Sequence, residues 1–195
     1  VKKLKNAVSS RLAYPNLPGP TIFDFNIEEG WYLEERIIGL PLDRIEREAK
    51  INGALSAAKS FMLRVYDDSA KLETALTWVK EKFKELDFAI DALPSCFKRQ
   101  DVQDLQFIKG QLESLARMSI DSEYLVLIAL THGDFQSANL LKPSVDKSKD
   151  VYIIDWEYAG RRCSHYDWFV YGLRARSSKG LASRVNCLLY CDVAE

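Results

Sequence analysis

The sequence lacks two features that would decide its surroundings: a long apolar run and a net charge. No apolar run approaches the ~20 residues that a membrane-spanning helix needs. The 27 lysines and arginines are balanced by 28 aspartates and glutamates, so the formal net charge is −1. Without a positive long-range field, we expect no nucleic-acid partner and no anionic membrane partner. With 195 residues, 47% of them hydrophobic, the composition is that of a globular protein.

A zinc site is also missing from the pattern. The four cysteines include no CxxC pair, and neither histidine completes a spacing typical of zinc. Two disulfides are formally possible, but the chain shows no signal peptide and is not a small loop-rich scaffold. Cys187 and Cys191 lie one helical turn apart, which is typical of a buried helix face. We therefore expect reduced thiols and a cytoplasmic protein.

The N-terminal quarter of the chain predicts a helix followed by a β-hairpin. Residues 2–13 are helix-like, and a run of prolines with Gly19 ends them. Two apolar runs, 21–27 and 31–38, are rich in aromatic and β-branched residues and are joined by a segment that contains Gly30. Such runs with a glycine-containing connection are typical of a hairpin. Gly39 and Pro41 then end the second run.

The rest of the chain is mainly helical by its pattern. Helical spacing of apolar residues dominates from about residue 43 to 120, with long helices predicted at about 69–93 and 100–118. We expect the aromatic side chains of these helices to lie in a core. Helix returns from about residue 166. Between them lie three short apolar segments that are candidates for buried strands: 125–130, 140–141 and 151–154. This order predicts an α+β protein rich in helix.

Two polar stretches follow directly on these buried strands. Asp134 and Asn139 lie in the first, THGDFQSAN, and Asp155 lies in the second, VYIIDWE. A single carboxylate at the end of a strand usually only caps a turn or ends an edge strand. Here, however, an Asp is followed five positions later by Asn, then by a hairpin, then by a strand that ends in Asp. That order matches the catalytic and metal-binding loops of kinases, so we interpret the two stretches as one phosphoryl-transfer site.

The residue types suit that chemistry. Mg²⁺ prefers oxygen ligands and keeps several waters, so it takes one or two protein groups in addition to phosphate oxygens. Asp155 supplies a charge for this purpose, and Asn139 supplies a neutral amide oxygen. Phosphoryl transfer depends mainly on in-line positioning and charge stabilisation. Asp134 is suited to accept a hydrogen bond from the attacking hydroxyl and to take its proton late.

These residues resemble those of a known family. His132-Gly133-Asp134 with Asn139, and Ile154-Asp155-Trp156-Glu157, are similar to the aminoglycoside phosphotransferase and choline kinase family, which shares the protein-kinase-like fold. That family has HGD where protein kinases have HRD, and an IDW or IDF acid where they have DFG. The resemblance covers about residues 14–175. It implies transfer of the γ-phosphoryl group of ATP to a hydroxyl of a small molecule, with ATP and Mg²⁺ as cofactors.

The resemblance also implies roles for the matching residues. Asp134 becomes the catalytic base, and Asn139 and Asp155 become the Mg²⁺ ligands. His132 becomes a structural member of the loop and not a proton donor.

Two further parts of the sequence match the family pattern. The segment YLEERIIGLPL resembles the family's hinge, so backbone atoms of Glu35, Arg36 and Ile37 are expected to hold adenine. Asp167 matches a buried aspartate that supports the catalytic loop. The role of Glu157 stays open: it is either a substrate contact or an ordinary carboxylate after a strand.

The expected fold is therefore α+β and protein-kinase-like, with a helix-rich C-lobe and a partial N-lobe sheet. Residues 1–39 are expected to be a remnant of the N-lobe with the hinge, and residues 40–195 to be the C-lobe. Within the C-lobe, residues about 43–120 form the helical substrate-pocket region and 131–157 carry the catalytic loops.

One departure from the family pattern limits these expectations. Neither a glycine-rich phosphate loop nor a strand lysine precedes residue 20. We therefore expect a piece of a longer protein that turns over ATP poorly by itself. The alternative is a non-catalytic, nucleotide-binding pseudokinase or scaffold fragment. A protein kinase is disfavoured by the HGD and IDW forms. The sequence leaves open the acceptor (aminoglycoside, choline or ethanolamine, or sugar) and the oligomeric state.

Overall fold

A computed structural model describes residues 2–46, 48–93, 98–119, 123–145, 150–174, 179–180 and 183–184. The chain forms two compact units: the first combines Val1–Ala70 with Ala129–Glu195, and the second is Lys71–Ile128. Three of the four cysteines and most of the helix expected beyond residue 174 lie outside the described residues. The lobe boundary at residue 39 stays a prediction.

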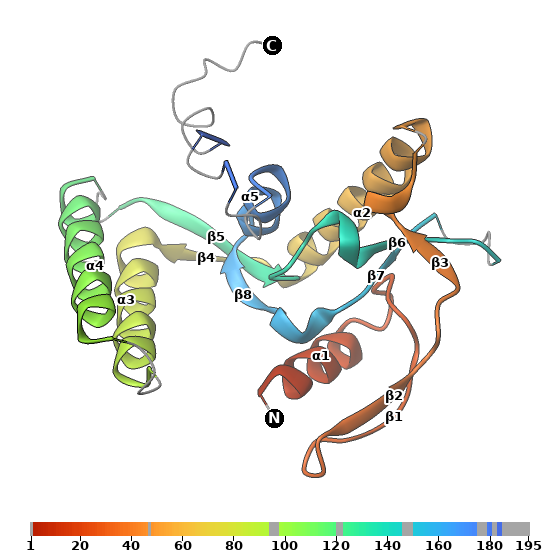
Figure 1. Cartoon of the computed structure of the whole chain (residues 1–195), viewed down its shortest axis with the longest axis horizontal. Helices are drawn as coiled ribbons and strands as arrows, with labels where there is room; N and C mark the ends of the chain where they lie inside the picture. Colours follow the sequence, from red (N-terminus) through yellow and green to blue (C-terminus); the bar gives the residue numbers. More distant parts are fainter. Residues whose placement is uncertain are drawn as a thin grey trace. The chain divides into compact units, whose positions relative to one another are not determined.

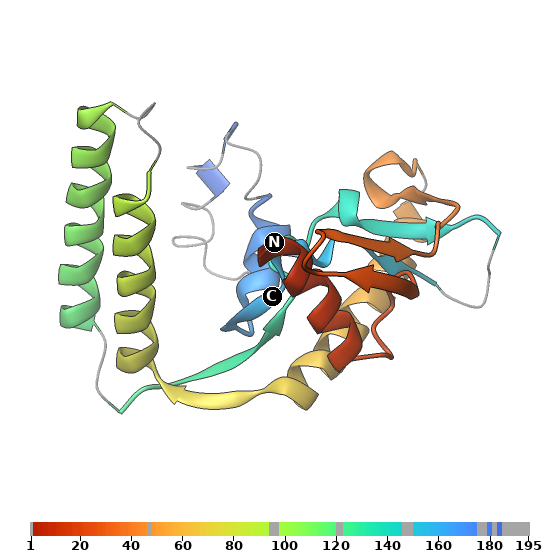
Figure 2. The same cartoon turned by 90° about the horizontal axis from the view of Figure 1, so that it is seen from below.

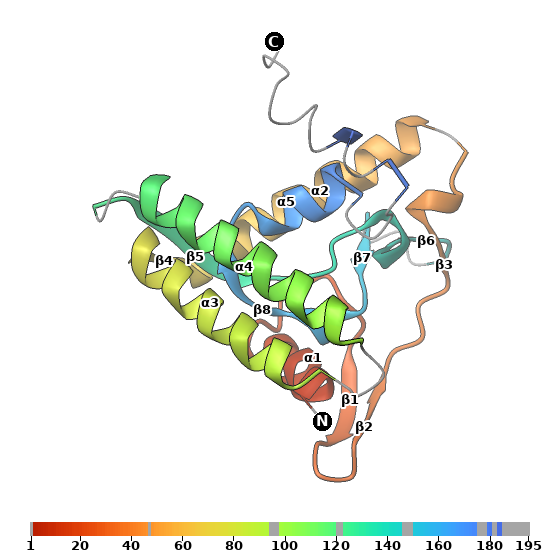
Figure 3. The same ribbon diagram turned by 60° about the vertical axis from the view of Figure 1, so that its left-hand side comes forward.

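The first unit begins with the predicted helix and hairpin. Helix α1 (Lys2–Ala13) is followed by the antiparallel strands β1 (Ile22–Asn26) and β2 (Trp31–Glu34), and α1 lies beside this hairpin (Figures 2 and 3). The turn is formed by side-chain chemistry. The Asn26 carboxamide oxygen accepts the backbone N–H groups of Glu28 and Glu29 at 3.0 Å, and Gly30 adopts a φ of 84°. Asx turns and a glycine in the left-handed region are typical of tight turns, so the hairpin prediction is confirmed.

Helix α2 (Glu48–Ser69; labelled in Figure 1) contributes several buried residues to the core of this unit. One 3₁₀ turn, η1 (Leu42–Arg44), precedes it where the sequence predicted the beginning of the helix. The buried apolar residues of α2 recur at three- or four-residue steps, as an amphipathic helix requires: Ala54, Ala58, Met62, Val65 and Tyr66.

A small sheet of order β3-β6-β7 lies against this core. Strand β6 (Leu140–Pro143) pairs antiparallel with β7 (Tyr152–Ile153) on one side and with β3 (Gly39–Pro41) on the other. The first two strands were predicted. Strand β3 was not, because glycine and proline were interpreted as breakers. Proline is tolerated here because β3 is an edge strand of the sheet.

The remaining elements of the first unit carry the polar stretches. Strand β5 (Leu125–Thr131) enters the unit with its last three residues, which are buried, and pairs there with β8 (Gly160–Cys163). The 3₁₀ turns η2 (Ser137–Asn139) and η3 (Trp156–Tyr158) follow β5 and β7. Helix α5 (Tyr166–Gly172) ends the described core. The sequence predicted β5 and α5 but not β8.

The second unit is a helical hairpin on a short ladder. Helices α3 (Ala75–Asp91) and α4 (Arg99–Ser119) lie side by side (Figures 2 and 3). The helix predicted from residue 69 is wrong at its beginning, because Lys71–Thr74 forms strand β4, paired antiparallel with Leu125–Ile128 of β5. Apolar spacing within one segment does not reveal a partner more than 50 residues away.

The expectation that the aromatic side chains of these helices are all core residues is also wrong. Phe88 and Phe107 are 77% and 67% exposed. Two packed helices share only one face, and these side chains lie off it. No helix among the described residues is both long and apolar enough to cross a membrane.

Candidate active site

The register of β6 and β7 brings the two polar stretches together. Asn139 directly precedes β6, and Asp155 follows soon after β7. Because Leu140 pairs with Ile153, the next pair outward joins the first stretch to the second: the backbone N–H of Ile154 donates to the carbonyl oxygen of Asn139 at 3.0 Å. An antiparallel ladder therefore places the predicted metal ligands on neighbouring strand ends.

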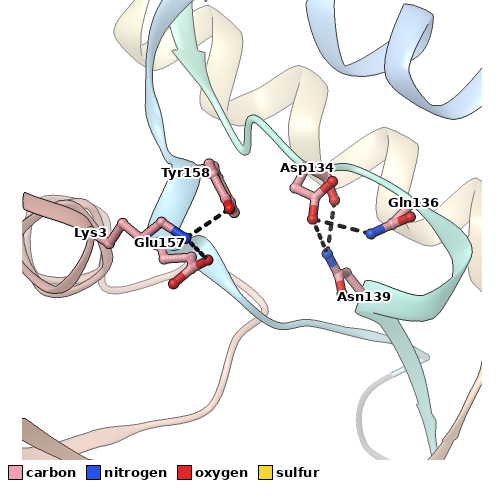
Figure 4. A network of polar contacts seen from close by, with 6 residues as sticks. All are labelled: Lys3, Asp134, Gln136, Asn139, Glu157 and Tyr158. Atoms are coloured by element: carbon pink, nitrogen blue, oxygen red, sulfur yellow. Dashed lines mark hydrogen bonds and ion pairs between the residues drawn. The ribbon is translucent and has the colours of Figure 1, made fainter. Parts of the chain in front are cut away.

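Asp134 and Asn139 form a direct contact (Figure 4). The Asn139 amide Nδ2 donates to the carbonyl oxygen of Asp134 at 2.9 Å and to its carboxylate Oδ2 at 3.2 Å. Gln136 Nε2 donates to the same Oδ2 at 3.1 Å. Both Asp134 and Asn139 are buried. Since Nδ2 faces Asp134, the amide oxygen of Asn139 is turned away from it and has no partner among the described residues.

Asp155 has a strained backbone. Its φ of 63° and ψ of 56° lie in the left-handed region, which residues other than glycine rarely adopt. Strain of this kind persists where the surroundings impose it and gathers at functional sites. Although the side chain is exposed, partial desolvation and then the charge of Glu157 raise the pKa of Asp155 above its usual value. A cation beside this carboxylate would relieve both effects.

These donors fit a hard divalent cation. Asp155 offers a carboxylate, and Asn139 offers an amide oxygen that no described residue occupies. In the described part of the chain, no group of three or more His, Cys, Asp or Glu side chains gathers as a metal cage. Few protein ligands, all of them oxygens, is the preference of Mg²⁺ and not of zinc.

His132 is fully buried beneath the loop, and both of its ring nitrogens have partners. Nε2 lies 2.8 Å from the carbonyl oxygen of Ile154, and Nδ1 lies 3.2 Å from the backbone nitrogen of Asp134. A carbonyl must accept and a backbone N–H must donate, so these partners require the neutral tautomer with its proton on Nε2. Burial lowers the pKa of His132, and nearby carboxylates oppose that effect only in part.

Asp167 supports the loop from behind. The side chain is fully buried, and its oxygens accept the backbone N–H groups of His132 at 2.8 Å and Gly133 at 2.9 Å. These are the contacts expected of it from the sequence. Gly133 has a φ of 84°, and a Cβ there would clash with the carbonyl oxygen of Tyr158. Only glycine fits this position.

Glu157 lies next to the predicted metal ligand but has a cation of its own. Lys3 Nζ of α1 lies 2.7 Å from Glu157 Oε1 and donates to the Tyr158 hydroxyl at 2.7 Å (Figure 4). The same ammonium lies 4.2 Å from the centre of the Tyr158 ring. The contact joins α1 to η3, a contact that the sequence did not predict.

The backbone groups of the predicted hinge segment are only partly hydrogen-bonded. The backbone N–H of Glu35 donates to the carbonyl oxygen of Thr21 at 2.8 Å, so it is already used. The backbone groups of Arg36 and Ile37 have no hydrogen-bond partner among the described residues. A hollow of about 180 Å³ borders this segment. Its other walls are Ile38, Pro143, Val145 and Tyr152.

A larger hollow of about 690 Å³ is lined in part by Gln136, Ser137 and Ala138, which follow Asp134 in the loop. Gln136, which donates to the Asp134 carboxylate, is one of its walls. Side chains of opposite charge, Asp43 and Arg174, also line it. Arg174 has a φ of 47°, so it is, like Asp155, a non-glycine residue in the left-handed region. The remaining walls are Leu42, Ile45, Ile51 and Tyr171.

The same arrangement of elements occurs in a solved structure. The structure of aminoglycoside phosphotransferase APH(3'')-Id from Streptomyces rimosus is similar to this one, with a TM-score of 0.54 and 15% sequence identity. The alignment covers 98% of this chain and 74% of the phosphotransferase chain. The chain has a protein-kinase-like fold. The α+β, kinase-like fold predicted from the sequence is thus confirmed.

Two more solved structures are similar at a lower level. The Streptomyces rimosus enzyme in complex with ADP and streptomycin aligns over 100% of this chain and 76% of its own, at 16% identity and a TM-score of 0.49. A glucosamine kinase aligns over 96% and 52%, at 15% identity and a TM-score of 0.45. No protein-family profile and no curated protein matches the sequence. Identities this low show the fold alone.

Sequence reasoning missed two residues that the kinase-like fold brings to the site. Gln136 lies between the two predicted residues of its stretch, and its position two residues after Asp134 was the available signal. Tyr66 donates its hydroxyl to Asp167 at 2.8 Å. It lies on the apolar stripe of α2, where spacing indicates burial alone, so no local pattern could have revealed its contact with Asp167.

Proposed function

We propose that this chain is a phosphotransferase that moves the γ-phosphoryl group of ATP to a hydroxyl of a small molecule. One observation carries the proposal: a buried Asp134 carboxylate, fixed by the Asn139 amide, lies on a loop that a backbone hydrogen bond joins to the Asp155 loop. In a kinase-like fold, this combination supplies a base and two metal ligands together.

Each residue has a defined task in this proposal. The Asn139 amide oxygen and the Asp155 carboxylate hold Mg²⁺, which supplies charge neutralisation for the phosphates of ATP. Asp134 accepts a hydrogen bond from the acceptor hydroxyl and takes its proton as the bond to phosphorus forms. The amide donors of Asn139 and Gln136 keep that carboxylate in one orientation. His132 stays neutral and holds the loop.

The two hollows are proposed to hold the two substrates. Adenine occupies the smaller one, where it forms hydrogen bonds with the unpartnered backbone groups of Arg36 and Ile37. The acceptor enters the larger hollow, because Gln136 connects its wall to the Asp134 carboxylate. Asp43 and Arg174 give that hollow charges of both signs, which suits a polar acceptor with several hydrogen-bonding groups.

A nucleotide-binding protein without catalysis is the second candidate function. Such a protein would use the Asn139 amide oxygen and the Asp155 carboxylate to hold Mg²⁺ with the nucleotide, and Asp134 would have no acceptor hydroxyl to contact.

An acceptor panel separates the two candidates. The purified chain is incubated with Mg²⁺, ATP and aminoglycosides, amino-alcohols or hexoses, and phosphorylated product is measured by mass spectrometry. The proposal expects product with one acceptor class, lost in Asp134→Asn and kept in Asp68→Asn, an exposed aspartate of α2. If ATP binds but no acceptor is phosphorylated by the wild-type chain, the second candidate is favoured.

A further inference from the structure

Asp167 is a fully buried carboxylate held by neutral donors. It accepts hydrogen bonds from the backbone N–H of His132, the backbone N–H of Gly133 and the Tyr66 hydroxyl, at 2.8 to 2.9 Å. A buried carboxylate is costly unless it is fully hydrogen-bonded. Each donor therefore matters, and Tyr66 is the donor that a side chain supplies.

The Tyr66 hydroxyl fixes the orientation of the carboxylate. It shares Oδ2 with the His132 N–H, while Oδ1 receives the Gly133 N–H. The Tyr66 ring is 3% exposed and meets the Trp168 ring edge to face at 6.0 Å. Trp168 belongs to α5, which lies beside α2 (Figure 3). The ring is thus locked, so its hydroxyl acts as a fixed donor.

A second side chain of α2 holds the strand that leads into the loop. Ser69, one helical turn after Tyr66, accepts the backbone N–H of Leu130 at 2.9 Å and donates to the carbonyl oxygen of Val65 at 2.6 Å. The last turn of α2 therefore holds the chain at two points. Ser69 binds the backbone of Leu130 directly, and Tyr66 binds Asp167, which in turn binds the backbone of His132.

We propose that Tyr66 is a positioning residue for the catalytic loop. Its hydroxyl orients Asp167, and Asp167 fixes the backbone of His132 and Gly133, the two residues before Asp134. The effect on catalysis rests on the proposed function, whereas the effect on the loop backbone does not. The two can therefore fail separately.

Backbone hydrogen exchange tests the proposal without any need for activity. Tyr66→Phe removes only the hydroxyl oxygen and keeps the ring contacts. Exchange of the His132 and Gly133 amides, measured by NMR, should speed up about tenfold to hundredfold, the range for a lost hydrogen bond to a charged group. Tyr14→Phe is the matched control, because Tyr14 is partly buried and its hydroxyl has no partner among the described residues.

A second comparison separates positioning from general loosening. Ser69→Ala should speed up the Leu130 amide and leave Gly133 near its wild-type rate, whereas Tyr66→Phe should do the reverse. Unchanged His132 and Gly133 rates in Tyr66→Phe overturn the proposal. So does an equal acceleration of all core amides, which would mean only a loss of global stability.

Turnover supplies the catalytic arm. In Tyr66→Phe, kcat should fall about tenfold or more while KM for ATP and acceptor stays at the wild-type value, because no substrate contact is removed. Faster loop exchange with an unchanged kcat would overturn the catalytic part. A wild-type chain that phosphorylates nothing contradicts the proposed function alone, and the exchange rates still decide whether Tyr66 positions the loop.

Discussion

Acidification should destabilise this protein through His132. The ring is buried, Nε2 donates to the carbonyl oxygen of Ile154, and Nδ1 accepts the backbone N–H of Asp134. A proton on Nδ1 would remove that acceptor and place a charge in the core. Burial therefore lowers the pKa of His132 in the folded protein, whereas in the unfolded chain it returns to about 6.5.

The sign and size of the effect follow from proton linkage. Below pH 6.5 the unfolded chain binds a proton that the folded protein excludes, so the free energy of unfolding falls as the pH falls. If His132 remains neutral in the folded state at pH 5.5, the loss relative to pH 8 is about 1.4 kcal/mol. That is an upper limit for one histidine, and it is a sizeable share of the stability of a domain.

Urea unfolding at several pH values measures this loss. His132→Gln keeps an amide donor near Ile154 but cannot titrate, so the difference between its pH profile and that of the wild type isolates the histidine. His165→Gln is the control, because His165 is exposed. The reasoning is refuted if wild type and His132→Gln lose the same free energy between pH 8 and 5.5.

Two further substitutions test the loop. Gly133→Ala should cost about 1–3 kcal/mol of unfolding free energy in urea, because φ is 84° and the new Cβ meets the Tyr158 carbonyl oxygen. Gly53→Ala, in open space on α2, should instead stabilise by about 0.5–1 kcal/mol. Asp167→Ala should lower stability by about 1–3 kcal/mol, since it leaves buried N–H groups unpaired, and should also lower turnover. A wild-type melting temperature together with wild-type turnover would remove its supporting role.

The parts of the fold that local pattern decides could be predicted. Helix α1, the hairpin turn at Asn26 and Gly30, and helix α4 all follow from spacing or turn chemistry within a few residues. Strand β4 could not be predicted in this way. Leu72 fits a helical stripe, and only the ladder with Leu125–Ile128 makes its segment a strand. Strand β3 was missed because its glycine and proline were interpreted as breakers, and the partner that makes it a strand lies about 100 residues further along the chain.

The site divides along the same line. Asp134, Asn139 and Asp155 could be selected from the sequence because their spacing on strand ends reflects the chemistry. The structure adds contacts that join distant segments: Tyr66 to Asp167, and Lys3 to Glu157. No period or motif connects these pairs. Contacts of this kind depend on packing, which one sequence does not reveal.

The division of labour between Asp134 and Asp155 is the centre of this account. In the proposal Asp155 binds the metal, whereas Asp134 contacts the acceptor hydroxyl and does not bind the metal. Removing each carboxylate should therefore affect nucleotide binding differently.

Isothermal titration calorimetry of Mg·ATP binding to the wild type, Asp155→Ala and Asp134→Ala tests this assignment most directly. Asp155→Ala should weaken Mg·ATP binding strongly, because a metal ligand is lost. Asp134→Ala should bind Mg·ATP nearly as the wild type does, while its turnover falls by about two to four orders of magnitude, the value of a positioned base. An equal loss of nucleotide affinity in the two variants, or no loss in Asp155→Ala, would contradict the assignment.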